Sequence, residues 1–176
     1  MSTVTRPPTA TRLLDAALTV LGERGARDLT VRAVEDRAGV PHGSVRHHFG
    51  DRRGLLVALF DHLEQRESPS PRASAGPDTV NPAAALVDTI EHWLGPGRSV
   101  ALARYELFLL AARDETLRAP LVRARERFVA QAAHVVGADR APAVVASVDG
   151  LVLDALVRGT HDRTALERAV ARLLAS

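Results

Sequence analysis

Hydrophobic residues recur at intervals of three or four along most of this 176-residue chain, the spacing that places them on one face of a helix. No segment shows the two-residue alternation of a strand. We therefore predict an all-α fold, with an N-terminal helical domain followed by a C-terminal helical bundle. The predicted helices are a first one that ends at Gly25, then Thr30–Arg37, a short one from about Pro41, one that follows Asp51, and Pro82–Leu94, Ser99–Arg113, Leu117–Val136, Arg140–Arg158 and Arg163–Leu174.

The segment 29–56 carries the most specific helix boundaries. Thr30 can accept a hydrogen bond from the free N–H groups of a first turn, so we expect it to cap a short helix. Gly39 follows where the chain leaves that helix through a left-handed residue, and Pro41 suits the first turn of the next helix. Asp51 is expected to cap a further helix. Short helices joined by a tight turn are the layout of a helix-turn-helix that docks on DNA.

The second helix of this motif presents a polar and slightly basic face. Val45 and Phe49 lie four residues apart and are expected to face inward. Gly43 lets the backbone approach a partner, and the hydroxyl of Ser44 can donate to phosphate oxygens or base edges. Arg52 begins the next helix, where a phosphate could bind. The predicted DNA-binding residues are Thr30, His42, Gly43, Ser44, Arg46, His47, His48 and Arg52.

This segment resembles the DNA-binding domain of the tetracycline-repressor (TetR/AcrR) family. Ala38-Gly39-Val40 and Phe49 match the family pattern, and Gly43-Ser44-Val45 stands at its Gly-Thr-Leu positions. Arg46 replaces the usual phosphate-binding Tyr and Arg52 the usual Lys. Both keep the capacity to bind phosphate, and Arg46 could also reach a guanine edge. The resemblance implies a homodimeric repressor that a small-molecule inducer releases from a palindromic operator.

Residues 67–81 interrupt the helical pattern. This segment holds three prolines among serines and a glycine, and its hydrophobic residues have no period. We therefore predict a flexible linker. It would separate a DNA-binding domain with its connecting helix, residues 1–66, from a ligand-binding and dimerisation domain, residues 82–176.

The helix predicted at 140–158 is apolar nearly all round, so it must be buried on more than one side. A domain of this size does not easily bury such a helix alone. We expect the last two helices of each subunit to form a two-fold four-helix interface, which the resemblance also implies. An internal core helix is the alternative. The predicted interface residues are Val145, Val148, Val152, Ala155, Leu166 and Val170.

The resemblance implies that a small-molecule effector binds in the C-terminal domain. Arg104 would be the one charged anchor in an otherwise apolar lining, although the lining residues are equally good core residues. A small helical enzyme or an interaction module that uses this cavity is the alternative function. The candidate lining residues are Trp93, Arg104, Leu107, Phe108, Ala111 and Phe128.

Composition narrows the remaining classes of function. Basic residues number 23 against 21 acidic ones, and the small excess lies in residues 1–66, which favours local attraction to DNA. The absence of cysteine excludes disulfides and thiolate zinc sites. We find no catalytic triad, phosphate-binding glycine loop or metal-ligand spacing, so we expect no enzyme, cofactor or metal. No membrane span or apolar signal core is present, which predicts a soluble, cytoplasmic protein without a membrane partner.

Overall fold

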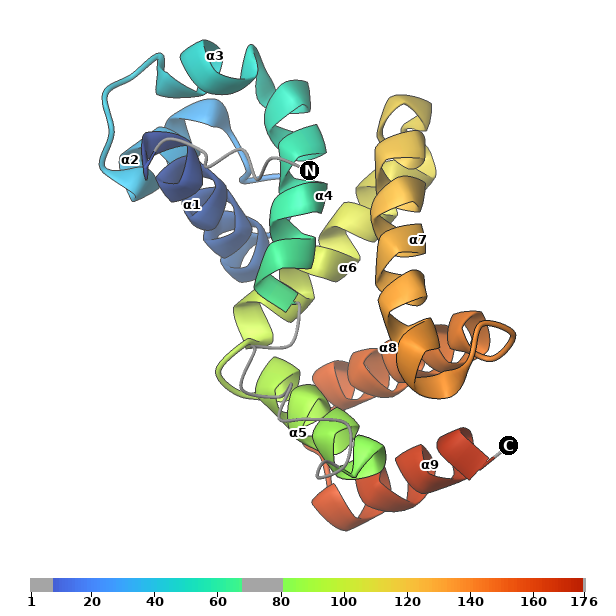
Figure 1. The fold of residues 1–176 in the computed structure, drawn as a ribbon. Coiled ribbons are helices and arrows are strands. Elements are labelled where there is room, and N and C mark those ends of the chain that lie inside the picture. The colour runs from blue at the N-terminus through green and yellow to red at the C-terminus, as the bar shows by residue number, and fades with distance from the viewer. Residues whose placement is uncertain (1–7, 68–80, 176) are drawn as a thin grey trace. The chain divides into compact units, whose positions relative to one another are not determined.

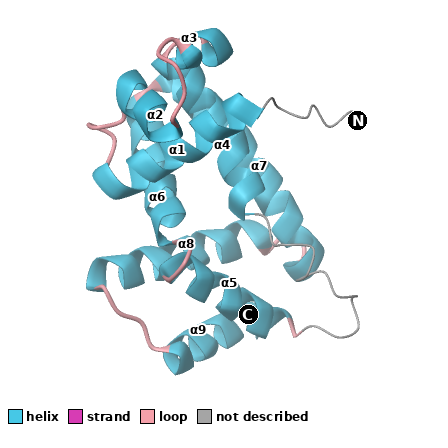
Figure 2. Ribbon diagram, turned by 90° about the vertical axis from the view of Figure 1, so that its left-hand side faces the viewer, coloured by secondary structure: helices cyan, strands magenta, loops and turns pink. Residues whose placement is uncertain are grey.

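The computed structural model describes residues 8–67 and 81–175. Within these ranges the chain forms nine α-helices and no strand, as Figure 1 shows along the chain and Figure 2 by element type. The expected all-α fold is confirmed. The helices are α1 (Pro8–Arg24), α2 (Val31–Ala38), α3 (Ser44–Phe49), α4 (Arg52–Glu67), α5 (Pro82–Leu94), α6 (Arg98–Arg113), α7 (Glu115–Val136), α8 (Ala141–Arg158) and α9 (Arg163–Ala175).

Contacts divide the chain into two compact units. The first comprises residues 1–66 and 99–124, and the second comprises residues 67–98 and 125–176. The expected boundary near residue 67 does not separate them, because most of α6 and the first part of α7 group with the N-terminal helices. Of the predicted linker, Glu67 ends α4 and Asn81 caps α5, while residues 68–80 lie outside the described residues.

One apolar core holds the first unit together. Ala103, Leu107 and Ala111 of α6 are fully buried in the same core as the leucines of α1 and α4, which explains why α6 belongs to this unit. The three- and four-residue spacing of hydrophobic residues in the sequence gives α1 and α4 one buried face each. Their buried members are Leu14, Ala17, Leu18, Leu21, Leu55, Leu56, Leu59, Phe60 and Leu63.

Helices α5, α8 and α9 pack together in the second unit. Arg163 at the start of α9 donates to Asp88 of α5 at 2.8 Å, and it also pairs with Glu91 on the same helix. Arg125 of α7 lies 2.6 Å from Asp149 of α8. These ion pairs link α9 to α5 and the middle of α7 to α8 inside this unit.

The residues predicted to form a dimer interface are buried inside the subunit, and this assignment is corrected. Their exposed fractions lie between 0% and 8%. Side chains that are covered within their own subunit offer no surface to a second copy, so the alternative of an internal core holds for this face of α8. Its other face carries the exposed Leu153 and Val157. The corrected residues are Val145, Val148, Val152, Ala155, Leu166 and Val170.

Candidate nucleic-acid interface

Helix α2 has the boundaries that the sequence indicates. The hydroxyl oxygen of Thr30 accepts a hydrogen bond from the backbone N–H of Ala33 at 3.1 Å, which caps the first turn. Gly39 ends the helix with φ of 61°, a left-handed conformation that costs glycine no side-chain clash. Val34 and Ala38 are buried, so the face of α2 that carries them packs against the core.

Helix α3 is shorter than expected, because it begins at Ser44 and not near Pro41. The reason is Gly43, whose φ of 91° lies outside the range of a right-handed helix, so the residues before Ser44 form a turn. Val45 is fully buried and Phe49 half-buried, as predicted. The outer face is polar: His42, Gly43, Arg46 and His47 are exposed, whereas Ser44 and His48 are half-buried.

A buried carboxylate that the sequence reasoning missed holds the start of α3. Glu35 of α2 is 2% exposed, and its Oε1 accepts hydrogen bonds from the N–H of Gly43 at 3.0 Å and of Val45 at 2.9 Å. Its Oε2 lies 3.3 Å from Nδ1 of His42. A helix whose first residues include no side-chain cap needs an outside acceptor for its free N–H groups, and this need is the signal that could have identified Glu35.

The same hydrogen bonds decide the charge of Glu35. The bond from the Val45 N–H has the largest effect and lowers the pKa of the carboxyl below its ordinary value of 4.5, while burial acts in the opposite direction. The hydrogen bonds from His42 and Gly43 lower this pKa further. Glu35 is therefore an ionised acceptor beneath the first turn of α3.

Arg12 of α1 holds the turn between α2 and α3, and the sequence reasoning missed this residue too. Its Nη2 donates to the carbonyl oxygens of Ala38 at 2.6 Å and Gly39 at 3.1 Å. These carbonyls belong to the end of α2, where no backbone partner within the helix remains. Arg12 and Glu35 thus fix the turn from opposite ends, with a cation on the carbonyls and an anion on the N–H groups.

At the start of α4, the predicted cap is present, but the predicted phosphate contact is not supported. Asp51 caps this helix as expected, since its Oδ1 accepts from the Gly54 N–H at 2.8 Å. The guanidinium of Arg52, however, turns back into the protein: Nε donates to the Leu29 carbonyl at 2.8 Å and Nη2 to the Ala26 carbonyl at 3.2 Å. Arg52 therefore fastens the loop between α1 and α2, and its predicted role as a phosphate contact loses support.

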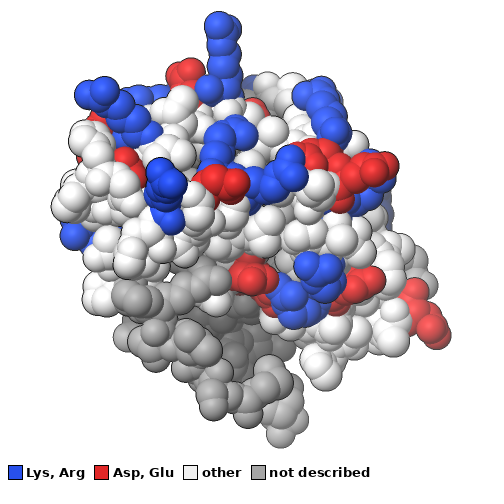
Figure 3. All heavy atoms as spheres, turned by 90° about the horizontal axis from the view of Figure 1, so that it is seen from above, with Lys and Arg blue, Asp and Glu red and all other residues white. Residues whose placement is uncertain are grey.

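Ser44 and Thr30 make local hydrogen bonds that limit what each can offer a ligand. The hydroxyl of Ser44 donates to the Pro41 carbonyl, so in this conformation its proton is not directed at DNA. Thr30 uses only a lone pair in its cap and keeps its hydroxyl proton as a donor. Figure 3 looks onto the side of the molecule that carries α3 and shows arginines spread among acidic side chains, without one continuous basic patch.

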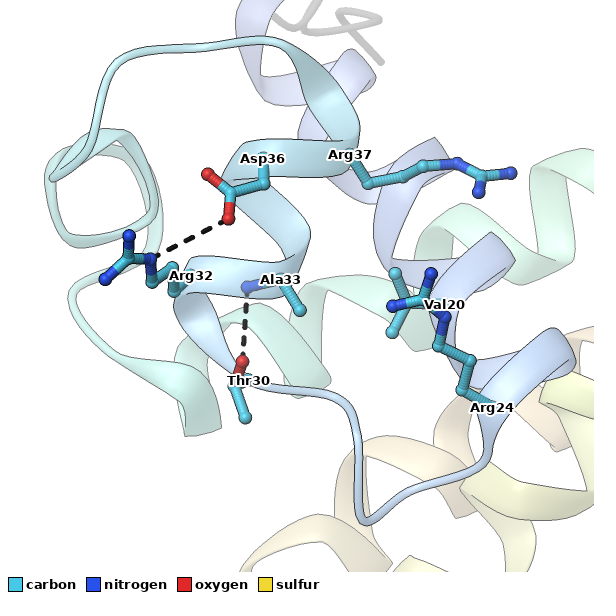
Figure 4. Close-up of a pocket in the computed structure, with 7 residues that line it drawn as sticks. All are labelled: Val20, Arg24, Thr30, Arg32, Ala33, Asp36 and Arg37. Atoms are coloured by element: carbon cyan, nitrogen blue, oxygen red, sulfur yellow. Dashed lines mark hydrogen bonds and ion pairs between the residues drawn. The ribbon is translucent and has the colours of Figure 1, made fainter.

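A hollow of about 360 Å³ lies on the outer side of α1 and α2. Figure 4 shows Arg32 turned toward Asp36 along the outside of α2, with Arg37 directed away from both. None of the residues predicted to bind an effector lines this hollow. Its lining is Val20, Arg24, Thr30, Arg32, Ala33, Asp36 and Arg37.

The six predicted effector-binding residues are divided between the two units. Arg104, Leu107, Phe108 and Ala111 lie on α6 in the first unit, whereas Trp93 of α5 and Phe128 of α7 lie in the second. Leu107 and Ala111 are fully buried core residues. The buried Arg104 donates to the hydroxyl of its neighbour Tyr105 at 3.3 Å and lies 5.0 Å from the centre of that ring.

Among the residues that the structure describes, no helix combines the length and the apolar character needed to cross a membrane.

Two family models match the sequence. One, described as bacterial regulatory proteins of the tetR family, matches residues 13–59. The other, described as the tetracyclin repressor-like C-terminal domain, matches residues 77–176.

Individual relatives agree with these models. The HTH-type transcriptional regulator CymR of Pseudomonas putida is 33% identical over 125 residues, which cover 68% of this chain and 60% of CymR. The HTH-type transcriptional regulator BetI of Serratia proteamaculans is 40% identical over 52 residues, or 30% of this chain and 26% of BetI. The matched regions thus span less than two thirds of either relative.

Two solved structures match over nearly the whole chain. A TetR family member from Streptomyces coelicolor has a TM-score of 0.77 and 30% identity, over 95% of this chain and 98% of that one. The multidrug binding protein EbrR complexed with ethidium has a TM-score of 0.74 and 30% identity, over 94% and 98%. The matched family models and sequence relatives are those of transcriptional regulators, which confirms the expectation that the protein is not an enzyme. The chain belongs to the TetR family of DNA-binding transcriptional regulators.

Proposed function

We propose that this regulator is a homodimeric repressor that reads a palindromic operator with α3 and leaves it when a small-molecule inducer binds. The observation that carries the proposal is the exposure of His42, Arg46 and His47 on a helix whose backbone is anchored from below by Glu35. A short helix with a fixed start and a polar outer face suits entry into the major groove by its N-terminal end.

The side chains divide into two roles. Arg46 and His42 lie where they can reach base edges, and an arginine can bind guanine through two parallel hydrogen bonds. Thr30 offers its hydroxyl proton to the phosphate backbone from the start of α2, where the helix dipole also favours an anion. Arg52 takes no part in this scheme, because its guanidinium is engaged by the carbonyls of Ala26 and Leu29.

The dimer in this proposal uses the outward face of α8. Val157 is 79% exposed and Leu153 44% exposed, and they lie four residues apart on one side of the helix. Apolar side chains of this size on one helix face gain free energy when a second copy covers them. Two copies related by a two-fold axis would present two α3 helices to two half-sites.

The inducer in this proposal is a small molecule that binds in the helices beyond the DNA-binding motif. Support comes from EbrR, which is described as a multidrug binding protein and has been solved with ethidium and with imidazole. Arg104 is a buried cation on α6, so a ligand with a hydrogen-bond acceptor group would find a charged partner there.

The experiment is selection of DNA from a random pool with the full chain, followed by mobility shifts on the enriched sequence. We expect an enriched inverted repeat that binds a dimer. Ligands found by thermal shift are then added to the complex, and an inducer should lower operator affinity. Selection without an inverted repeat would refute DNA reading by a dimer, and stabilising ligands that leave operator affinity unchanged would refute induction.

A further inference from the structure

The two oxygens of Glu35 have different partners. Oε1 accepts from two backbone N–H groups, those of Gly43 and Val45, at 3.0 and 2.9 Å. Oε2 faces Nδ1 of His42 at 3.3 Å. The imidazole of His42 is itself outside: its side chain is 63% exposed, against 3% for Glu35. A buried group of fixed orientation thus holds one ring nitrogen of a residue on the candidate DNA-reading surface.

An ionised carboxylate can accept hydrogen bonds but cannot donate them. The Val45 N–H keeps the pKa of Glu35 low, so this carboxyl stays ionised at neutral pH. Nδ1 of His42 must therefore carry the proton that forms the bond. In the neutral ring only one nitrogen has a proton, which leaves Nε2 as an acceptor. Asp36 Oδ1 is 3.8 Å from Nε2, beyond hydrogen-bond distance, so Nε2 remains open to a ligand.

We infer that Glu35 is a specificity-determining positioning residue: it fixes the tautomer of His42, so that Nε2 of the neutral ring accepts a hydrogen bond from an adenine or cytosine of the operator. In the major groove, N4 of cytosine is a donor, and adenine presents the donor N6 beside the acceptor N7, whereas O6 and N7 of guanine and O4 of thymine are acceptors. This inference rests on the proposed function, because it requires that the start of α3 meets base edges.

The variant Glu35→Gln inverts this polarity without changing the shape of the side chain. The amide must direct its oxygen at the N–H groups of Gly43 and Val45, since an NH₂ group there would face two donors. Its NH₂ group then lies where Oε2 faced His42 and donates to Nδ1. The proton of the neutral ring moves to Nε2, and the outward nitrogen becomes a donor, which suits guanine, thymine or N7 of adenine but finds no acceptor on cytosine.

The test is DNA selection at pH 8.5 with the full chain of wild type, Glu35→Gln, His42→Ala and Asp36→Asn. We expect wild type to prefer adenine or cytosine by about tenfold at one position of each half-site, and His42→Ala to lose this preference. Glu35→Gln should reject cytosine there, because cytosine offers the outward N–H no acceptor. Asp36→Asn is the matched control, because it removes a carboxylate beside the same ring without touching Nδ1, and it should keep the wild-type base.

A second measurement needs no DNA. Nitrogen-15 NMR of the histidine rings at pH 8.5 should show the Nδ1–H tautomer for His42 in wild type and the Nε2–H tautomer in Glu35→Gln. The same tautomer in both proteins, or a preference for cytosine in Glu35→Gln, overturns the inference. If Glu35→Gln does not fold, wild type alone still tests the inference. A proton on Nε2 of His42, or a preference for guanine or thymine, in wild type would overturn it. An inverted repeat without a position that depends on His42 refutes this inference alone, whereas no inverted repeat at all refutes the proposed function.

Discussion

Gly22 of α1 lies directly against the backbone of Ser99 of α6. A Cβ atom added to Gly22 would lie 1.9 Å from the carbonyl oxygen of Ser99, a distance that no relaxation of a side chain can relieve, because the obstructing atom belongs to the backbone. Glycine is therefore required here by packing and not by backbone conformation. The contact joins α6 to the helices that carry the candidate DNA-reading surface.

Gly22→Ala should destabilise the protein by about 2–3 kcal/mol, because α1 and α6 must separate to accept the methyl group. Equilibrium unfolding in urea measures this effect. Gly150→Ala is the matched control: Gly150 also lies within a helix, and in the described part of the chain no atom beyond its chain neighbours and its own helix backbone lies within 4 Å of the added Cβ. Its free energy of unfolding should stay within about 1 kcal/mol of wild type. If both substitutions changed the free energy of unfolding equally, the close packing of Gly22 against Ser99 would be refuted.

Arg52→Ala and Arg46→Ala should differ in kind. Loss of Arg52 leaves the carbonyls of Ala26 and Leu29 without their donor and should lower stability by about 1–2 kcal/mol, with little change in the salt dependence of operator binding. Loss of Arg46 should instead change base preference or lower the salt slope by about one unit, because its exposed guanidinium is free to meet DNA. Operator affinity measured across a salt series separates the two. If the salt dependence of operator binding were weaker in Arg52→Ala than in wild type, the predicted contact between Arg52 and a phosphate would be supported after all.

The contribution of Glu35 to the free energy of unfolding should decrease as the pH is lowered. Its pKa in the folded protein lies below the ordinary 4.5, so the carboxylate stabilises the fold above that value and loses this effect as the pH falls through the folded-state pKa. The difference in unfolding free energy between wild type and Glu35→Gln should therefore be largest above the ordinary pKa of 4.5 and shrink as the pH falls below it. Denaturant unfolding across this range gives the measurement, and Glu23→Gln, which removes an exposed carboxylate of α1, corrects for the general loss of one acid. A difference that grows toward low pH would contradict the lowered pKa.

Val157→Arg and Val148→Arg distinguish the two faces of α8. Val157 is 79% exposed, so its substitution should leave the fold intact and weaken the proposed dimer. Val148 is 6% exposed, and an unpaired charge there should unfold the second unit. Sedimentation velocity together with circular dichroism reports both effects. A folded, fully dimeric Val157→Arg protein would exclude this face as the dimer surface.

Local chemistry in the sequence was sufficient to predict the helices and several of their ends. Thr30, Gly39 and Asp51 act where the pattern placed them, because caps and left-handed turns depend on side chains within a few residues of the helix end. The apolar stripes of α1 and α4 were equally readable, since a helix with one polar face has only one face to bury. The order of these signals also indicated the family before any contact was known.

Tertiary structure decided the features that depend on partners distant in the sequence. Glu35 and Arg12 were not among the residues predicted from the sequence, yet they hold the turn before α3 because that turn folds back over α1 and α2. For α8, apolar residues on several sides left open which side the subunit covers, and packing with α5 and α9 settled it. Arg52 shows the general reason: the composition of a helix start indicates that a cation is present, but only the fold determines whether backbone carbonyls already occupy it.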